Sequence, residues 1–206
     1  MVLNMRRLAG GLTLLTVLAA TTAGCVPLVI GGAALSGAAV VADRRSSATQ
    51  LEDQTIEIKA GNRIRDVVGE RAHVTVTSYN RAVLLTGEIF KEEDRAAIEA
   101  AVRRVDNVKS VSVEDLAVAW PSSAADRSND TLLTTKVRAS LVDAAGVSVG
   151  AFKVFTDRRV VYLFGRVTEA EANRAIDLAR GVQGVQKVVR MVEIITQDEL
   201  KSILGK

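Results

Sequence analysis

The stretch Val83-Leu84-Leu85-Thr86-Gly87 occurs a second time, in altered form, as Val161-Tyr162-Leu163-Phe164-Gly165. The two glycines are 78 residues apart, and each stretch follows a second short apolar segment, residues 74–76 or 152–154, at the same distance. Short apolar runs that are separated by a polar turn are typical of β-hairpins. The sequence therefore predicts one structural unit that is present twice.

A helix is predicted before each hairpin and another after it. Each first helix has an apolar stripe with four-residue spacing, which places its side chains on one face. The stripe consists of Ile56, Ala60 and Ile64 in the first unit and, 77 residues later, of Leu133, Val137 and Leu141 in the second. The second helices carry Ile98, Ala101, Val102 and Val105, and Ala172, Ala175, Ile176 and Ala179. Closing strands are expected at residues 108–113 and 185–195.

The predicted fold class is α+β. Each unit is expected to run helix-strand-strand-helix-strand, with a three-stranded sheet packed on two helices, and with polar hairpin turns at residues 79–81 and 156–159. The first unit is assigned to residues 50–118, the second to 128–196, and a linker to 119–127. The tail, residues 197–206, receives no function.

The first 24 residues are typical of a secretory signal peptide. Arg6 and Arg7 precede an apolar run over residues 8–20, which is too short to span a bilayer as a helix. The run leads to Thr22-Ala23-Gly24-Cys25, which resembles the bacterial lipobox, where the cysteine is acylated and the chain is cut before it. Because Cys25 is the only cysteine, we predict acyl chains on Cys25 that anchor the protein in a membrane. An ordinary cleaved signal followed by an unrelated cysteine is the alternative.

An apolar tether is predicted between the anchor and the first unit, over residues 25–49. Residues 26–42 carry no charge, and Asp43-Arg44-Arg45-Ser46-Ser47 then ends the apolar part. Arg44 and Arg45 are expected either to touch lipid phosphates or to lie in a solvated linker. Removal of the signal lowers the net charge from +3 to +1, so the basic character of the whole chain gives no argument for nucleic acid as a partner.

Catalysis finds little support in the residue types. One cysteine and one histidine exclude an internal disulfide, a cysteine-cluster metal site and a paired-histidine site. His73 precedes a strand and is predicted to be a solvated strand residue. The carboxylates of Glu92, Glu93 and Asp94 are expected at the start of a helix, where they complement the helix dipole. We therefore predict no enzyme, no cofactor and no metal site.

Residues of both units resemble a known family, the BON domain. The resemblance rests on the V-x-V, V-L-L-T-G and V-x-x-V-x-x-V signatures, and on their tandem arrangement after a lipobox. With Asp43, Arg45, Ser46, Thr49 and Gln50, the chain resembles the dual-BON outer-membrane lipoproteins of the DolP type. The resemblance implies a lipid-anchored protein of the Gram-negative outer membrane that faces the periplasm. Val26 after the cysteine, rather than Asp, favours that membrane.

The same resemblance implies that the second unit binds anionic phospholipid and supports envelope integrity and, by extension, cell division. An envelope scaffold that contacts assembly or division proteins is the alternative. The candidate lipid-binding residues are Leu132, Leu133, Thr135 and Lys136. They follow Asp130, which is the expected N-cap of the helix.

Leu132 is the distinctive residue of this set. It lies about 100° from the core stripe and is expected to face solvent, whereas the matching position of the first unit is Thr55. An exposed leucine beside a lysine suits shallow insertion among anionic headgroups. The alternatives are an ordinary exposed residue or one that packs on the other unit. Trp120, the only tryptophan, is expected to pack between the units or to act as an interfacial anchor.

Overall fold

The computed structural model describes residues 43–113, 115–142 and 144–205. The signal peptide, Cys25 and the predicted tether as far as residue 42 lie outside the described residues. Asp43 to Ser46 lead into the first helix, and the described chain then forms two domains of the same topology.

The first domain runs from α2 to β4. Helix α2 (Ser47–Val68) and a short 3-10 turn (Gly69–Arg71) precede strands β1 (His73–Tyr79) and β2 (Ala82–Ile89), helix α3 (Glu92–Arg103), and strands β3 (Ser110–Ser112) and β4 (Leu116–Val118). Strand β1 is antiparallel to β2, and both β3 and β4 are parallel to β2. The single closing strand predicted at residues 108–113 is thus divided into two short pieces along β2.

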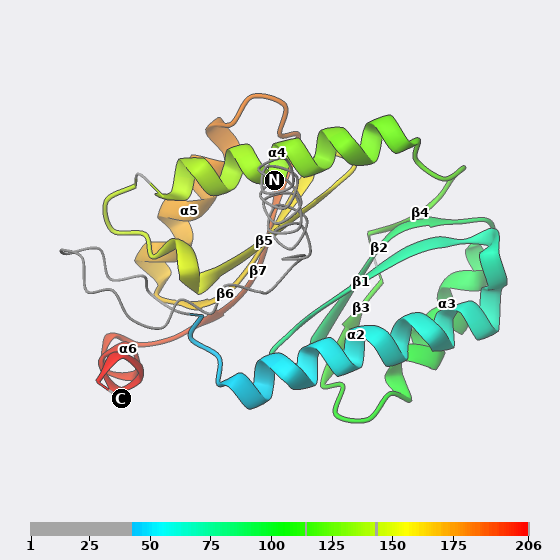
Figure 1. Ribbon diagram of the computed structural model, residues 1–206, viewed down its shortest axis with the longest axis horizontal. Helices are drawn as coiled ribbons and strands as arrows, with labels where there is room; N and C mark the ends of the chain where they lie inside the picture. Colours follow the sequence, from blue (N-terminus) through cyan, green and yellow to red (C-terminus); the bar gives the residue numbers. More distant parts are fainter. Residues whose placement is uncertain (1–42, 114, 143, 206) are drawn as a thin grey trace, which may run out of the picture. The chain divides into compact units, whose positions relative to one another are not determined.

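The second domain repeats this order. Helix α4 (Ala124–Val142) and a 3-10 turn (Val149–Ala151) precede β5 (Phe152–Asp157), β6 (Val160–Val167), α5 (Glu169–Gly181) and β7 (Lys187–Ile194). Strand β5 is antiparallel to β6, and β7 is parallel to β6. Both helices of each domain lie on one face of its sheet, which confirms the predicted α+β fold (Figure 1). The tail forms a further helix, α6 (Gln197–Leu204).

Each domain has its own apolar core between the helices and one face of the sheet. The predicted stripes lie in these cores: Ile56, Ala60 and Ile64 are buried in the first, and Val137 and Leu141 are buried in the second. Each fully buried isoleucine, leucine or valine among them contributes roughly 1.5–3 kcal/mol to stability. No residue of one domain belongs to the core cluster of the other among the described residues.

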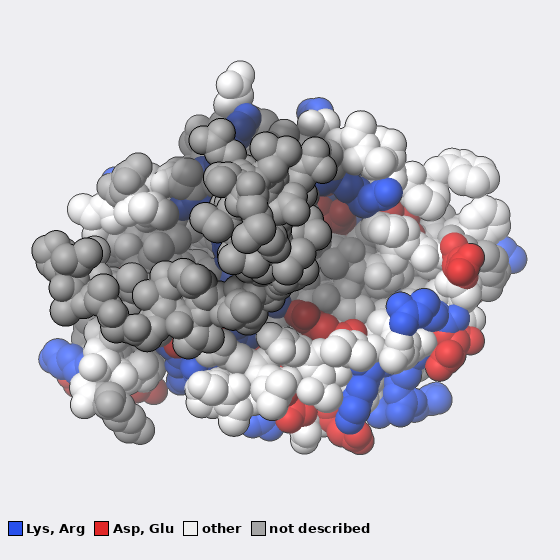
Figure 2. Space-filling model, in the orientation of Figure 1, with Lys and Arg blue, Asp and Glu red and all other residues white. Residues whose placement is uncertain are grey.

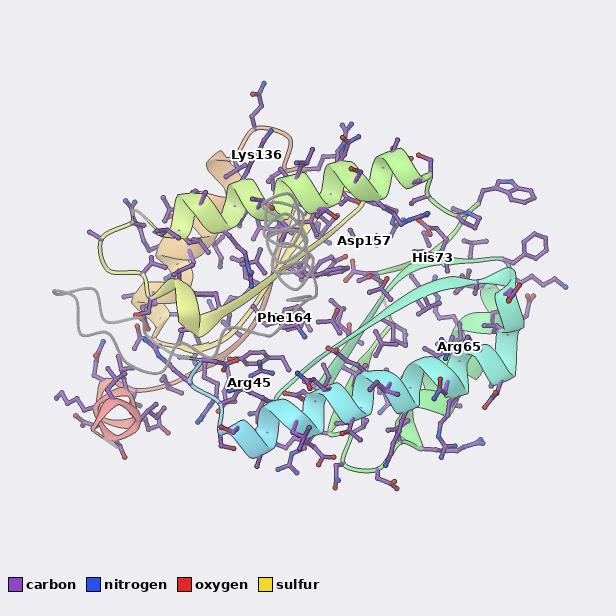
Figure 3. All side chains as sticks on the ribbon, viewed as in Figure 1. Arg45, Arg65, His73, Lys136, Asp157 and Phe164 are labelled. Atoms are coloured by element: carbon purple, nitrogen blue, oxygen red, sulfur yellow. The ribbon has the colours of Figure 1, made fainter. Side chains whose placement is uncertain are left out.

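The opposite faces of the two sheets pack on each other. Successive residues of a strand point to opposite faces of the sheet. The neighbours of Leu84 on β2 and of Tyr162 and Phe164 on β6 point into the cores, so these three side chains point to the face without helices. They form one buried cluster with Tyr79, and Phe164 is labelled in Figure 3. The ammonium of Lys153 bridges the domains by donating to the Glu57 carboxylate at 2.8 Å and to the Ser78 carbonyl at 3.2 Å. The two domains therefore share an interface whose centre is apolar.

Asp130 is not the N-cap that the sequence suggested. Helix α4 begins six residues earlier, because the Ser123 hydroxyl accepts from the Asp126 backbone N–H and the Asp126 carboxylate accepts from the Ser123 N–H. Asp130 is buried within the helix, and its carboxylate accepts from the backbone N–H groups of Arg158 and Arg159, at 2.8 and 2.9 Å. Four residues of the predicted linker are thus helical.

The first domain has the same contact between a buried aspartate and the hairpin turn. Asp53, 77 residues before Asp130, accepts from the N–H groups of Asn80 and Arg81 at 2.8 and 2.7 Å. The two central residues of each hairpin turn have positive φ, between 47° and 68°, which is the conformation of a tight two-residue hairpin turn. Outside glycine this conformation is strained, and the carboxylate behind each turn offsets the strain by holding both amides.

Candidate membrane-facing site

Helix α4 separates the four candidate residues into one buried and three exposed side chains. Leu132 is 58% exposed, as expected, whereas Leu133 is only 6% exposed and faces the core. A Cβ on Gly184 would lie 3.6 Å from the Leu133 Cδ1, so the leucine packs against the loop before β7. The prediction that Leu133 itself contacts lipid is therefore wrong for this structure, since its place in the core stripe removes it from the surface.

Thr135 and Lys136 are exposed on the same helix. The Thr135 hydroxyl donates to the Thr131 carbonyl at 3.1 Å and is satisfied within the helix. Lys136, labelled on α4 in Figure 3, makes no hydrogen bond or ion pair with any described residue. Its ammonium lies one turn from Leu132 and is free to meet an external anion.

In the first domain, the lysine that corresponds to Lys136 is neutralised by an ion pair. Lys59 corresponds to Lys136 by the 77-residue offset, and its ammonium lies 3.2 Å from the Asp106 carboxylate. In the second domain the position of Asp106 is occupied by Gln183, so the lysine there has lost its acidic partner. Sequence reasoning missed this difference, although the offset placed both residues in register.

A second substitution acts in the same direction. Glu52 of α2 accepts a hydrogen bond from the Asn107 amide at 2.8 Å, and the position of Glu52 in the second domain is Asn129. The four matched positions Glu52, Thr55, Lys59 and Asp106 carry a formal charge of −1, whereas Asn129, Leu132, Lys136 and Gln183 carry +1. Acidic and basic side chains lie intermingled over α2, at the lower right of Figure 2.

The hairpin turn of the second domain borders this surface. Arg158, Arg159, Asn129 and Gln186 line a hollow of about 350 Å³ beside the first half of α4. Arg159 is exposed, and hydrogen bonds from Ser123, together with the charges of Arg159 and Arg127, lower the pKa of Asp126. Asp126 and Asp130 line the same hollow, so its two arginines face two carboxylate side chains.

Arg44 and Arg45 neither form a solvated linker nor reach toward lipid phosphates. Arg44 is buried, and most of the Arg45 side chain is covered by protein contacts. The Arg44 guanidinium donates to both carboxylate oxygens of Glu171 on α5, at 2.8 and 2.7 Å, and to the Arg166 carbonyl. Burial alone would raise the pKa of Glu171, but the hydrogen bonds from Arg44 and Thr168 outweigh burial and lower it.

Arg45 contacts the first domain, whereas Arg44 contacts the second. Arg45 contacts the Asp43 and Asp53 carboxylates, the latter at 2.7 Å, and its guanidinium lies 4.0 Å from the ring centre of Tyr79 (Figure 3). Two consecutive side chains thus fasten the start of the described chain to both domains. We call Arg44 and Arg45, with Glu171 and Asp53, the arginine strap.

The remaining sequence candidates show no catalytic arrangement. His73 is partly exposed on β1, and its Nδ1 lies 3.4 Å from the buried Glu88 carboxylate. Glu92, Glu93 and Asp94 occupy the first turn of α3, as predicted. Residues 43–205, apart from positions 114 and 143, hold no cluster of three metal-ligating side chains. Nor does this part contain a helix long and apolar enough to cross a membrane.

Known proteins resemble this chain over most of its length. The BON domain family model matches residues 52–119 and 129–196. Outer membrane lipoprotein DolP of Haemophilus influenzae is 34% identical over 174 residues, which cover 84% of this chain and 89% of that protein. A 21 kDa hemolysin of Actinobacillus pleuropneumoniae is 29% identical over 157 residues, covering 74% and 79%. The solved structural protein CdsD of the Chlamydia trachomatis type III secretion system covers 70% of this chain at 12% identity, and its TM-score of 0.29 is too low to bear on fold or function.

Proposed function

The chain belongs to the BON-domain family as a dual-BON outer-membrane lipoprotein of the DolP type, and from this premise we propose that its second BON domain binds anionic phospholipid. The relation also confirms the predicted localisation at the outer membrane of a Gram-negative bacterium. In this proposal the acyl chains on Cys25 hold the protein at the membrane, and α4 makes a reversible headgroup contact that supports envelope integrity and cell division.

The observation that carries the proposal is the difference between the two repeats. The surface formed by Asn129, Leu132, Lys136 and Gln183 has a free ammonium and an exposed leucine, where the first domain has an ion pair and a threonine. We call these four residues the α4 patch. A lysine without an internal partner attracts a phosphate, and an exposed leucine beside it enters the boundary between headgroups and acyl chains.

The expected affinity of the α4 patch is low. Burial of the exposed part of Leu132 gives about 1–2 kcal/mol, and a lysine near an anionic surface gives about 1 kcal/mol. The sum of roughly 3 kcal/mol corresponds to an enrichment of about 100-fold at an anionic surface. A lipid anchor that holds the domain close to the membrane strengthens such a weak contact by raising its effective concentration.

The proposal is tested by co-sedimentation of a soluble chain that begins at residue 26 with vesicles of phosphatidylcholine alone or mixed with phosphatidylglycerol. Binding is expected to grow with the phosphatidylglycerol fraction. Leu132→Glu should reduce it at least about tenfold, because the apolar contact is lost and repulsion is added. Thr55→Glu, at the matching position of the first domain, should change binding less than about twofold.

A second pair of variants tests the charge argument. Gln183→Asp restores the acid that pairs with the lysine in the first domain and should weaken binding about fivefold, the equivalent of roughly 1 kcal/mol. Asp106→Gln removes that acid from the first domain and should leave binding to phosphatidylglycerol vesicles through α4 unchanged. Equal losses for Leu132→Glu and Thr55→Glu would contradict the proposal, because they would indicate bulk charge rather than a site. Absence of lipid binding, with capture of a specific envelope protein, would favour a scaffold instead.

A further inference from the structure

The first domain carries an exposed aromatic pair that neither core uses. Phe90 follows β2, and Trp120 follows β4, which is parallel to β2, so the two side chains emerge from neighbouring strand ends. Their ring centres are 6.1 Å apart in an edge-to-face arrangement. Trp120 is 83% exposed, and Phe90 and Val118 are each 50% exposed. Trp120 therefore does not pack between the domains, which was one of the two roles expected for it.

The pair is held in place and does not sit on a loose linker. The Ala119 N–H donates to the Ile89 carbonyl at 3.2 Å, which continues the pairing of β4 with β2. The Ser122 hydroxyl donates to the buried Glu88 carboxylate on β2, and the Arg127 guanidinium donates to the Ser122 carbonyl. Hydrogen bonds thus fix the chain on both sides of Trp120 while its indole stays outside.

The charges around Phe90, Val118 and Trp120 nearly cancel. Lys91 is exposed, and its ammonium pairs with no described side chain. Glu92 is neutralised by Arg95, whose Nε lies 2.6 Å from its carboxylate, and Glu93 is exposed. Asp94 in the same turn is partly exposed and brings the formal charge of residues 91–95 to −1, so this surface, unlike the α4 patch, has no excess positive charge that attracts anionic lipid.

The size and chemistry of this surface favour a lipid interface over a protein partner. Aromatic side chains cover about 150–250 Å² each, so the exposed parts of the three residues amount to roughly 300 Å². Stable protein interfaces need about 800 Å² from each partner. Tryptophan is enriched at membrane–water boundaries, where its ring is apolar and its N–H still reaches water. The bilayer is also the surface to which an outer-membrane lipoprotein is permanently held.

We propose that Phe90, Val118 and Trp120 form a second membrane contact, which inserts into the bilayer interface irrespective of lipid charge. It lies in the first domain and the linker, four residues before α4 begins, and is separate from the α4 patch. With the anchor, the two contacts would orient the protein on the membrane at points in both domains.

The only tryptophan of the chain reports on this contact directly. Acylated full-length protein is reconstituted into vesicles of phosphatidylcholine, with or without phosphatidylglycerol, and the tryptophan emission is recorded. The emission maximum of the acylated protein in vesicles should lie at shorter wavelength than that of the unacylated chain in buffer without detergent. Lipids brominated near the headgroup should quench it roughly twofold, since interfacial side chains lie about 5–10 Å deep. Both effects should be equal in the two vesicle types.

Matched variants separate this contact from the α4 patch. Phe90→Ser, at a half-exposed position, should leave the fold intact and reduce the quenching by at least half. Leu132→Glu should leave the Trp120 signal unchanged, although it removes the dependence of soluble-chain binding on phosphatidylglycerol. Emission and quenching that stay at the level of water-exposed indole in both vesicles would overturn the inference. A shift that depends on protein concentration without lipid would also overturn it, because it would indicate a second copy of the chain.

Discussion

Replacement of Arg44 by alanine tests the arginine strap. The guanidinium supplies two charged hydrogen bonds to Glu171 and one to the Arg166 carbonyl, and both side chains of the pair are almost fully buried. Removal of one partner of a buried ion pair costs about 3–5 kcal/mol. Glu171 keeps its hydrogen bonds from the Thr168 N–H and hydroxyl, so the lower end, about 3 kcal/mol, is expected.

Hydrogen exchange resolves where this cost falls. Amides of α5 and β6 should exchange roughly 100-fold faster in Arg44→Ala than in the wild type, since each 1.4 kcal/mol is a factor of ten. Amides at residues 83–85, in the core of the first domain, should change much less. Arg44→Lys keeps the charge but not the bidentate geometry, so its amide exchange rates in α5 and β6 should lie between those of the wild type and Arg44→Ala.

The stability difference between the wild type and Arg44→Ala should depend on pH. The pKa of Glu171 is lowered in the folded protein from an ordinary value of 4.5, so its contribution to stability is complete above pH 4.5. That contribution is lost as the pH falls through the lowered folded pKa. The difference between wild type and Arg44→Ala should therefore shrink in acid. An unchanged difference at acidic pH, or no difference at neutral pH, would refute the role assigned to this pair.

Three further substitutions have defined outcomes. Cys25→Ser should abolish incorporation of labelled palmitate, and retention of the label at the wild-type level would show that the anchor is elsewhere. Asp130→Asn should destabilise the second domain by about 1–3 kcal/mol in urea unfolding, because one amide oxygen replaces two charged acceptors at the turn. Val161→Asp puts an unpaired charge into the second core and should unfold that domain, while amides at residues 83–85 stay protected. Loss of protection in both domains would show one cooperative unit.

The sequence predicted the repeat, the hairpins and the apolar stripes because these depend on local periodicity. It did not predict the interface between the sheets, although the run Val161-Tyr162-Leu163-Phe164 is apolar at every position. Such a run indicates a strand that is buried on both faces, whereas a half-exposed strand alternates. Tyr162 and Phe164 were thus a signal that the uncovered face has a partner.

The arginine strap could not be predicted in this way, since Arg44 and Glu171 are far apart in sequence and no spacing connects them. Asp130 was misassigned because aspartate is common at helix starts, and its use behind a hairpin turn requires the tertiary structure. For the α4 patch, the exposure of Leu132 followed from helix geometry. The freedom of Lys136 became evident only from the ion pair that Lys59 makes in the first domain.

The claim that the second BON domain meets anionic lipid is tested most directly by residue-resolved NMR in lipid nanodiscs. Isotope-labelled protein is added to phosphatidylglycerol-containing nanodiscs that carry a spin label near the headgroups, and the loss of each amide signal is measured. Signals of residues 129–136 on α4 should be attenuated, as should those around Phe90 and Trp120, and those of the matching residues 52–59 on α2 should be retained. Equal attenuation of both helices, or attenuation centred on α2, would contradict the assignment of lipid binding to the α4 patch.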